Sequence, residues 1–223
     1  MIHHENKGAF VHHLEGETLH LLPEKAVYWE EKEMLIVADL HLGKAGHFRK
    51  AGVPIPAAVH WQDLKVLSSL LSGFQPEKVL LLGDLFHSML NNEWWDFERL
   101  LAHFSKVQFV LVKGNHDILP EAAYCLPNLE VHAEVLTIVP FVFSHIPPEK
   151  GKPQEGYYIS GHIHPGVRMI GEKLPCFCFS PEGALLPAFG RFTGFVSIKV
   201  RKRDRIFVIL PPAKDQAKVI ALP

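Results

Sequence analysis

The residues Val110–Leu119 read VLVKGNHDIL and change abruptly from apolar to polar chemistry. The run Val107–Val112 (VQFVLV) is short, rich in β-branched residues and interrupted by one polar residue, which predicts a buried strand. The strand ends near Gly114, and the triplet Asn115–Asp117 (NHD) follows at once. Asn and Asp favour turns, so the triplet alone fits a simple turn as well as a functional site. The ends of the other predicted strands decide between these two interpretations.

Four more apolar stretches end in the same kind of polar cluster. Each stretch is short enough for a buried strand, and each cluster offers His, Asp or both. A single cluster of this kind is usually a turn, but five in one chain are hard to explain by turn chemistry. Side chains at the carboxyl ends of parallel strands face a common crevice, so we expect one shared site. The clusters are Asp39-Leu40-His41 after Met34–Ala38, Gly83–His87 after Lys78–Leu82, Ser144-His145 after Phe141–Phe143, and Gly161–His164 after Tyr157–Ser160.

The side chains in these clusters suit a centre of two divalent metal ions. Carboxylate, amide oxygen and imidazole suit Mn²⁺, Fe or Zn²⁺, and no Cys lies at a strand end to indicate a thiolate site. Asp39 and His41 are two residues apart, so an extended strand end can aim both at one ion. His162 and His164 share this spacing, although a tight turn could send them to different ions. Asp84 is the natural bridging ligand, because one carboxylate offers two oxygens to ions about 3.5–4 Å apart.

The chain is 223 residues long, with 48% hydrophobic and 21% charged residues, which suits one globular domain with a substantial core. In the first half, strands alternate with helical periodicity at Ala57–Leu71 and Glu93–Phe104, which indicates parallel βαβ units. The second half contains short strands separated by turns, which indicates a largely antiparallel sheet packed on the first. We expect a single domain over residues 1–223, with residues 1–15 and 212–223 at its periphery.

Bulk charge predicts no partner, because 23 Lys and Arg residues balance 24 Asp and Glu residues; a nucleic acid would need a local basic patch. Three cysteines fit a reducing compartment, and we expect Cys176 and Cys178 to be buried as small apolar residues. No apolar run approaches a membrane span, and the N-terminus lacks a secretory signal, so we expect a cytoplasmic protein with no membrane partner. Four of the 15 histidines precede the predicted core and are expected at the surface: His3, His4, His12 and His13.

Taken in order, the five clusters resemble the motifs of the calcineurin-like metallophosphoesterases: D-x-H, G-D-x-x-H, G-N-H-D, a lone His and G-H-x-H. The resemblance spans Asp39–His164 and is specific as an ordered set. It implies a four-layer α/β/β/α sandwich with two packed mixed β-sheets and the metals between them. It also implies that His116 faces the phosphate and protonates the leaving oxygen, with Asp117 orienting His116. The implied ligands are Asp39, His41 and His164 for one metal ion, Asn115, His145 and His162 for the other, and Asp84 as the bridge.

Longer stretches resemble the bacterial ligase-associated DNA-damage-response phosphoesterases, the PdeM-like family, whose members are named endonucleases. They are Ala38–Gly52 (ADLHLGKAGHFRKAG), Gly83–Ser88 (GDLFHS), the Trp94-Trp95 pair and Leu174–Gly194 (LPCFCFSPEGALLPAFGRFTG). This resemblance implies Mn²⁺ as the metal, a phosphodiester substrate such as single-stranded DNA, and functional association with a DNA ligase and a helicase. It implies phosphodiesterase chemistry more strongly than DNA as the substrate.

Several residues outside the ligand set are candidates for substrate contacts. Lys44 and Arg49 could contact the phosphates of a polynucleotide or could lie on a solvated face. His87 fits a substrate-facing group better than a ligand, and Arg168 could reach a phosphate with two hydrogen bonds. One residue of the Trp94-Trp95 pair could stack on a base at the rim of the site, or the pair could pack in the core.

These features favour a dinuclear metal-dependent phosphodiesterase that acts in DNA repair. Two alternatives remain: a small-molecule phosphoesterase of the 2′,3′-cyclic nucleotide type on the same site, and a non-catalytic subunit of a repair complex. A long basic groove would favour a polynucleotide, and a closed pocket would favour a small substrate. The complete ligand set argues against a non-catalytic subunit, because a site without catalysis has no need of seven ligands.

Overall fold

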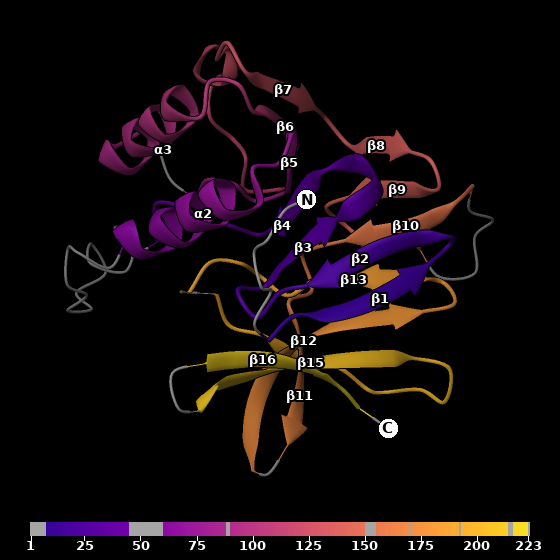
Figure 1. The fold of residues 1–223 in the computed structure, drawn as a ribbon. Helices are drawn as coiled ribbons and strands as arrows, with labels where there is room; N and C mark the ends of the chain where they lie inside the picture. The colour runs from indigo at the N-terminus through magenta and orange to yellow at the C-terminus, as the bar shows by residue number, and fades with distance from the viewer. Residues whose placement is uncertain are drawn as a thin grey trace.

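The computed structural model describes residues 8–44, 60–87, 90–149, 155–169, 171–191, 193–213 and 216–222. Two β-sheets pack face to face, and the helices α2 (His60–Phe74) and α3 (Asn92–His103) lie against the outer face of the first sheet (Figure 1). This arrangement confirms the predicted α/β fold with two packed mixed sheets. The short 3-10 helices are η1 (Glu30–Lys32) and η3 (Glu121–Tyr124).

The first sheet contains the three parallel strands that the sequence predicts. Its strand order is β1-β2-β3-β4-β5-β6-β7, and each of β4, β5 and β6 runs parallel to the next strand. The bounds of β4 and β5 agree with the prediction, and β6 begins one residue later than predicted. The strands are β1 (Phe10–Leu14), β2 (Glu17–Leu21), β3 (Ala26–Trp29), β4 (Met34–Ala38), β5 (Lys78–Leu82), β6 (Gln108–Val112) and β7 (Leu129–His132).

Strand β4 is apolar at every position because both of its faces are buried. Leu35 and Val37 pack in the apolar cluster that the helices cover. Met34, Ile36 and Ala38 pack in the cluster between the two sheets. The strand is therefore fixed from both sides, and the residue that follows it leaves the sheet at a defined point.

The second sheet is mixed, and its parallel pairs matter for the site. Its main strand order is β14-β11-β12-β13-β10-β9-β8, with β15 pairing with β12 and β16. β10 runs parallel to both β9 and β13, so the chain leaves β9 and β10 at the same edge. The strands are β8 (Val135–Ile138), β9 (Phe141–Ser144), β10 (Tyr157–Ser160), β11 (Pro165–Met169), β12 (Glu172–Ser180), β13 (Gly183–Leu185), β14 (Val196–Ser197), β15 (Arg205–Ala213) and β16 (Gln216–Ala221).

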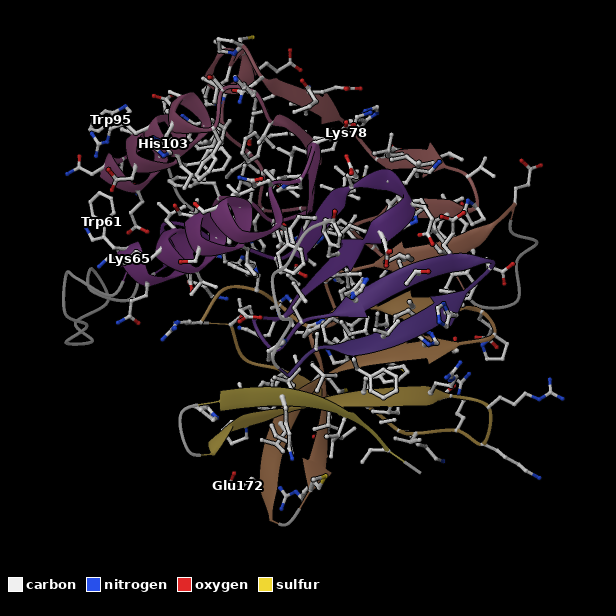
Figure 2. The ribbon with its side chains drawn as sticks, in the orientation of Figure 1. Trp61, Lys65, Lys78, Trp95, His103 and Glu172 are labelled. Atoms are coloured by element: carbon white, nitrogen blue, oxygen red, sulfur yellow. The ribbon has the colours of Figure 1, made fainter. Side chains whose placement is uncertain are left out.

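Helix α3 begins at an N-cap residue, Asn91. The side chain of Asn91 accepts the backbone N–H of Glu93 at 2.8 Å, which satisfies one of the unpaired donors of the first turn. Trp94 is fully buried, whereas Trp95 is half exposed on the outer side of the helix (Figure 2). Trp94 therefore packs in the core, which is one of the two roles that the sequence allows for the pair, whereas Trp95 faces solvent.

Helix α2 continues past its predicted end. The sequence predicts Ala57–Leu71, but residues 57–59 lie outside the described residues and the helix runs on to Phe74. The ring of Phe74 lies 4.6 Å from the ring of Tyr28 on β3, so packing against the sheet extends the helix through Gly73. Neither α2 nor any other helix in the described ranges has the length and hydropathy to cross a membrane.

Cys176 and Cys178 are buried on β12, as predicted, and neither forms a disulfide. They alternate with Phe177 and Phe179, which face the first sheet, so the cysteines pack in an apolar cluster on the other face. Burial raises the pKa of both thiols to about 12, so the reactive thiolate form is disfavoured at neutral pH.

His12 corrects the prediction of a surface histidine. The side chain is 1% exposed, and its ring lies 4.5 Å from Phe179 and 4.8 Å from Phe207, both on the second sheet. Because histidine is polar, the sequence pattern does not indicate that His12 occupies an inward-facing position of β1. His13 faces solvent as predicted, and His3 and His4 lie outside the described residues.

Both segments that the sequence places at the periphery contribute strands. In residues 1–15, β1 pairs with β2, and in residues 212–223, β16 pairs with β15. The N–H of Val219 also donates to the carbonyl of Gly8 at 2.7 Å, which joins the two segments to each other.

We expect His12 to make stability depend on pH. Burial lowers the pKa of His12 from 6.5 to about 4, so the unfolded chain binds a proton more tightly than the folded chain. The contribution of neutral His12 is fully present above pH 6.5 and is lost as the pH falls toward 4. Between pH 7 and pH 5, the free energy of unfolding of the wild type should fall by about 2 kcal/mol more than that of His12→Leu. Urea denaturation at both pH values measures this difference.

His103→Leu is the control, because His103 is an exposed histidine at the end of α3 and is not among the groups that shift the pKa of His12. This variant should keep the pH response of the wild type. An equal pH response in the wild type and His12→Leu would contradict the assignment.

Candidate metal centre

The five predicted strand ends converge at one edge of the two sheets. The parallel strands β4, β5 and β6 release the chain at this edge of the first sheet, and β9 and β10 do so from the second. Backbone hydrogen bonds join the first two ends directly. The N–H of Asp39 donates to the carbonyl of Gly83 at 3.2 Å, and the N–H of His41 donates to the carbonyl of Asp84 at 2.8 Å.

Asp39, His41 and His164 form one group that could hold a metal ion, with their ligand atoms within 4.8 Å of one another. Nε2 of His164 lies 3.1 Å from Oδ1 of Asp39, and the rings of His41 and His164 meet edge to face at 5.4 Å. Asp39 and His41 follow β4, whereas His164 comes after β10. The group therefore draws its ligands from both sheets.

Asp84, His145 and His162 form a second group with the same spread of ligand atoms. Nδ1 of His162 lies 3.1 Å from Nε2 of His145. Oδ1 of Asn115 also lies 3.1 Å from that nitrogen, so the amide oxygen faces the same point as the two imidazoles. The sequence-predicted set of Asn115, His145 and His162 is thus brought together, with Asp84 beside it.

The carboxylate of Asp84 faces both groups, one oxygen toward each. Its Oδ2 lies 3.8 Å from Nε2 of His41, a member of the first group. Its Oδ1 lies 3.5 Å from Nε2 of His145, a member of the second. This is the geometry that a bridging carboxylate requires, because each oxygen can bind a different ion.

The donor atoms fit divalent cations. Buried polar atoms are normally hydrogen-bonded, yet several atoms of this site have no hydrogen-bond partner among the described residues. Cations would satisfy those that present a lone pair, one nitrogen from each imidazole. The unpartnered atoms are Oδ1 of Asp39, both ring nitrogens of His41, Nδ1 of His145 and Nε2 of His164.

Burial favours the neutral, metal-binding form of two of the imidazoles, those of His41 and His145. Burial, followed by the nearby charge of Lys44, lowers the pKa of His41 to about 2. Burial also lowers the pKa of His145, although the carboxylates of Asp39 and Asp84 partly oppose this. A neutral histidine keeps a free lone pair for a cation, so burial prepares these side chains as ligands.

The backbone of the site is strained at five of the predicted metal ligands. Asp39, His41, Asp84, His162 and His164 have φ angles of 53°, 49°, 47°, 64° and 50°, in the left-handed region. Residues other than glycine rarely adopt such angles, and they persist only where the surrounding structure enforces them. Strain at five of the seven predicted ligands indicates that side-chain placement outweighs local backbone preference here.

Two glycines let the ligands approach one another. A Cβ at Gly161 would collide with Oδ2 of Asp39, and a Cβ at Gly114 would collide with the carboxylate of Asp84. The N–H of His162, next to Gly161, donates to the same Oδ2 of Asp39 at 3.0 Å. The glycines of the G-N-H-D and G-H-x-H motifs are therefore required by close packing between strand ends.

We expect Gly161→Ala to weaken metal binding, because the added methyl group displaces the Asp39 carboxylate. Disturbing groups that orient metal ligands typically lowers metal affinity about 10- to 100-fold, and we expect a loss in that range. Titration calorimetry with Mn²⁺ measures the affinity directly. Gly16→Ala is the control: it strains a turn at φ 84° with no atom near the new Cβ, so it should lower stability and leave affinity intact. Unchanged affinity in Gly161→Ala would contradict the packing explanation.

His116 lies beside the two groups and remains accessible. Its N–H donates to Oδ1 of Asp84 at 2.9 Å, and Nε2 of its ring lies 4.0 Å from Oδ2 of the same carboxylate. The side chain is 44% exposed, so a molecule bound at the site can reach the ring. The ring of His87 lies against it at 4.1 Å, and His41 lies 5.9 Å away.

Asp117 is buried and is bonded to backbone. Its carboxylate accepts the N–H of Phe86 at 3.1 Å and the N–H of Gly114 at 2.8 Å. Burial raises the pKa of Asp117 to about 6, although these two hydrogen bonds oppose the shift. Asp117 therefore ties the loop of residues 114–117 to the segment after β5.

The predicted substrate-contact residues differ in where they lie. Lys44 is partly buried, and the charges of Asp84 and Asp39 act on its ammonium group, which places it near the ligands. His87 lies against His116, as described above. Arg168 is exposed on β11, and among the described residues no contact joins it to the predicted ligands. Arg49 lies outside the described residues.

Two carboxylates that support the site were not predicted. Glu93 of α3 is buried and accepts the N–H of Gly43 at 2.7 Å, which ties the helix to the chain after β4. Asp63 of α2 accepts the N–H of Arg191 at 3.1 Å. Acidic residues are common in the first turn of a helix, where their negative charge is attracted to the positive end of the helix dipole. Nothing in the sequence distinguishes Glu93 or Asp63 from that ordinary role.

Comparison with known proteins agrees with this geometry. The model of the family described as calcineurin-like phosphoesterase matches residues 33–164. The crystal structure of the Pseudomonas putida nuclease MPE is similar over 90% of this chain and 96% of that chain, with a TM-score of 0.76 and 29% identity. Yfce, a phosphoesterase from E. coli, covers 78% of this chain and 86% of its own, with a TM-score of 0.44 and 16% identity. No curated protein sequence matches this chain.

The family match spans more than half of the chain and contains all five strand ends. Within it, the structure gathers carboxylate, amide and imidazole donors, and several of their buried atoms have no hydrogen-bond partner among the described residues. The chain therefore belongs to the calcineurin-like phosphoesterase family and is a metal-dependent phosphoesterase.

Proposed function

We propose that the protein is a dinuclear metal-dependent phosphodiesterase that cleaves phosphodiester bonds in nucleic acid, with Mn²⁺ as its metal. The observation that carries the proposal is the position of Asp84, whose two oxygens face two separate groups of ligands at 3.8 and 3.5 Å. A carboxylate shared in this way supports two adjacent ions, and two-ion sites are typical of phosphodiester cleavage.

Seven residues would hold the two ions. Asp39, His41 and His164 would bind one ion, Asn115, His145 and His162 would bind the other, and Asp84 would bind both. When bound, the ions supply positive charge that activates water and stabilises the charge of the reacting phosphate. Four of the seven side chains are buried, those of Asp39, His41, Asp84 and His145, and backbone hydrogen bonds between the strand ends hold Asp39 and His41 beside the segment that carries Asp84.

His116 would donate the proton that the leaving oxygen needs. It is next to the ligand Asn115 in the chain, but its ring is accessible rather than directed into either group of ligands. A donor within reach of a substrate at the metal centre suits general-acid catalysis. Asp117 would be a positioning residue, acting through the backbone N–H groups that it binds on either side of the loop.

The proposed substrate is single-stranded DNA in a repair setting. The Pseudomonas putida protein that is similar to this chain over 90% of its length is named a nuclease, which supports nucleic acid as the substrate. Lys44 lies near the ligands and would contact a phosphate, and His87 would face the substrate beside His116. Arg49 and Arg168 remain candidates for more distant phosphates. Association with a DNA ligase and a helicase rests on the family resemblance of the sequence.

The substrate class is tested by Mn²⁺-dependent turnover of single-stranded DNA, a 2′,3′-cyclic nucleotide and an aryl phosphodiester. We expect cleavage of all three or of DNA and the aryl diester, lost on chelation of the metal and restored by Mn²⁺. Turnover of the small substrates without any DNA cleavage would overturn the polynucleotide assignment and favour a small-molecule phosphoesterase.

We expect His116→Ala to lower kcat by about 10²- to 10⁴-fold on DNA, the usual range for loss of a general acid. Because p-nitrophenolate leaves without protonation, the loss on a p-nitrophenyl diester should be at least about tenfold smaller. Steady-state kinetics with both substrates measures the ratio.

Lys65→Ala serves as a control, because Lys65 is exposed on α2 (Figure 2) and belongs to neither group of predicted ligands. It should leave both rates unchanged. Equal losses in His116→Ala on the two substrates would exclude proton donation to the leaving group as the role of this residue.

A further inference from the structure

A cavity of about 300 Å³ adjoins the metal centre and shares His164 with it. Its walls are chiefly apolar, with several prolines and the ring of Phe195, and its cationic residues are Lys25 and Arg191. This volume is at the lower end of the range for ligand pockets. The cavity therefore suits one small, rigid group rather than a length of polymer.

The cavity is held in a fixed position relative to the metal ligands. His164 directs Nε2 toward Asp39 at 3.1 Å and Nδ1 toward the carbonyl of Gly194, a cavity residue, at 3.2 Å. The N–H of Gly190 donates to the carbonyl of Asp39 at 3.1 Å, which attaches the cavity wall to the end of β4. A molecule bound in the cavity would thus contact the imidazole ring of His164, which lies beside Asp39 and His41.

Phe195 offers an aromatic surface that is itself supported. Its ring packs so closely on Gly166 of β11 that a Cβ at that glycine would collide with it. Only part of Phe195 is exposed, so the ring has limited freedom to move. Stacking on aromatic side chains is the common way in which proteins hold unpaired bases without sequence preference.

The polar end of the cavity has an excess of positive charge. Lys25 and Arg191 both line it, and the carboxylate of Asp63 lies 3.6 Å from Nε of Arg191. The ammonium of Lys25 donates to the carbonyl of Gly190 at 3.4 Å and has no closer acceptor among the described residues. An apolar slot with a positive end matches a flat base that carries a phosphate.

We propose that this cavity binds the nucleobase of the nucleotide next to the scissile phosphate, with the base on Phe195 and Lys25 near its phosphate. The inference rests on the proposed phosphodiesterase function and names the part of the substrate that the protein recognises. This site is separate from Trp95, which is exposed on α3 and is not among the residues that line the cavity.

The experiment compares two Mn²⁺-dependent substrates with the same leaving group. Thymidine 5′-(p-nitrophenyl phosphate) carries a base, and methyl p-nitrophenyl phosphate carries none. We expect the wild type to prefer the thymidine ester in kcat/KM, and Phe195→Leu to reduce that preference at least about fivefold, the lower limit of a base–aromatic stack. Lys25→Gln should leave the preference unchanged, because Lys25 would face the phosphate that both esters share. Trp95→Leu should keep the wild-type preference. A preference unchanged in Phe195→Leu, or lost in Trp95→Leu instead, would overturn the proposal.

A binding measurement separates this proposal from the function on which it rests. Titration of metal-free protein with thymidine 5′-monophosphate, followed by NMR, should show saturable binding that weakens at least about fivefold in Phe195→Leu. Binding that depends on Phe195 with no turnover of either ester would retain the cavity and reject the phosphodiesterase. Turnover of both esters with no Phe195-dependent binding or preference would reject the cavity and retain the enzyme.

Discussion

The structure depends on two buried carboxylates whose oxygens lie 3.1–3.8 Å from the ring nitrogens of several histidines. Asp39 is 0% exposed and Asp84 is 2% exposed, and each is surrounded by nitrogen lone pairs or N–H groups at 3–4 Å. Burying a carboxylate without compensating charge is costly, and burying several unpartnered ring nitrogens adds to that cost. Cations bound between these groups would compensate the buried negative charge and the unpartnered lone pairs, so the unfavourable burial would favour metal binding. On that basis we regard the metal centre as the feature around which the strand ends are arranged.

The rest of the fold supplies the rigidity that such a centre needs. Apolar strands fixed on both faces deliver Asp39 and Asp84 at one edge, and left-handed backbone turns aim their side chains inward. Gly161 provides the space for the second sheet to close on the first. Beyond these residues, Asp117 holds the loop that carries His116. Strain at the ligands is thus balanced by packing in the layers behind them.

The sequence predicts the parts whose local and tertiary preferences agree. The continuous apolar runs of β4 and β5 have the predicted bounds, and Asn91 caps α3, because burial, strand propensity and capping chemistry all favour these elements. The predicted ligands are also brought together. The sequence does not predict the burial of His12, because a polar residue breaks the strand pattern and only the phenylalanines of the second sheet explain its place. Likewise, the contact of Asp63 with Arg191 joins residues far apart in the chain, which no local pattern can indicate.

Anomalous diffraction from crystals grown with Mn²⁺ tests the two-ion centre most directly. We expect two anomalous peaks about 3.5–4 Å apart, with the Asp84 carboxylate between them. Asp39, His41 and His164 should surround one peak, and Asn115, His145 and His162 should surround the other. A single peak, or two peaks that do not share Asp84, would contradict the bridging role of this carboxylate and the dinuclear mechanism built on it.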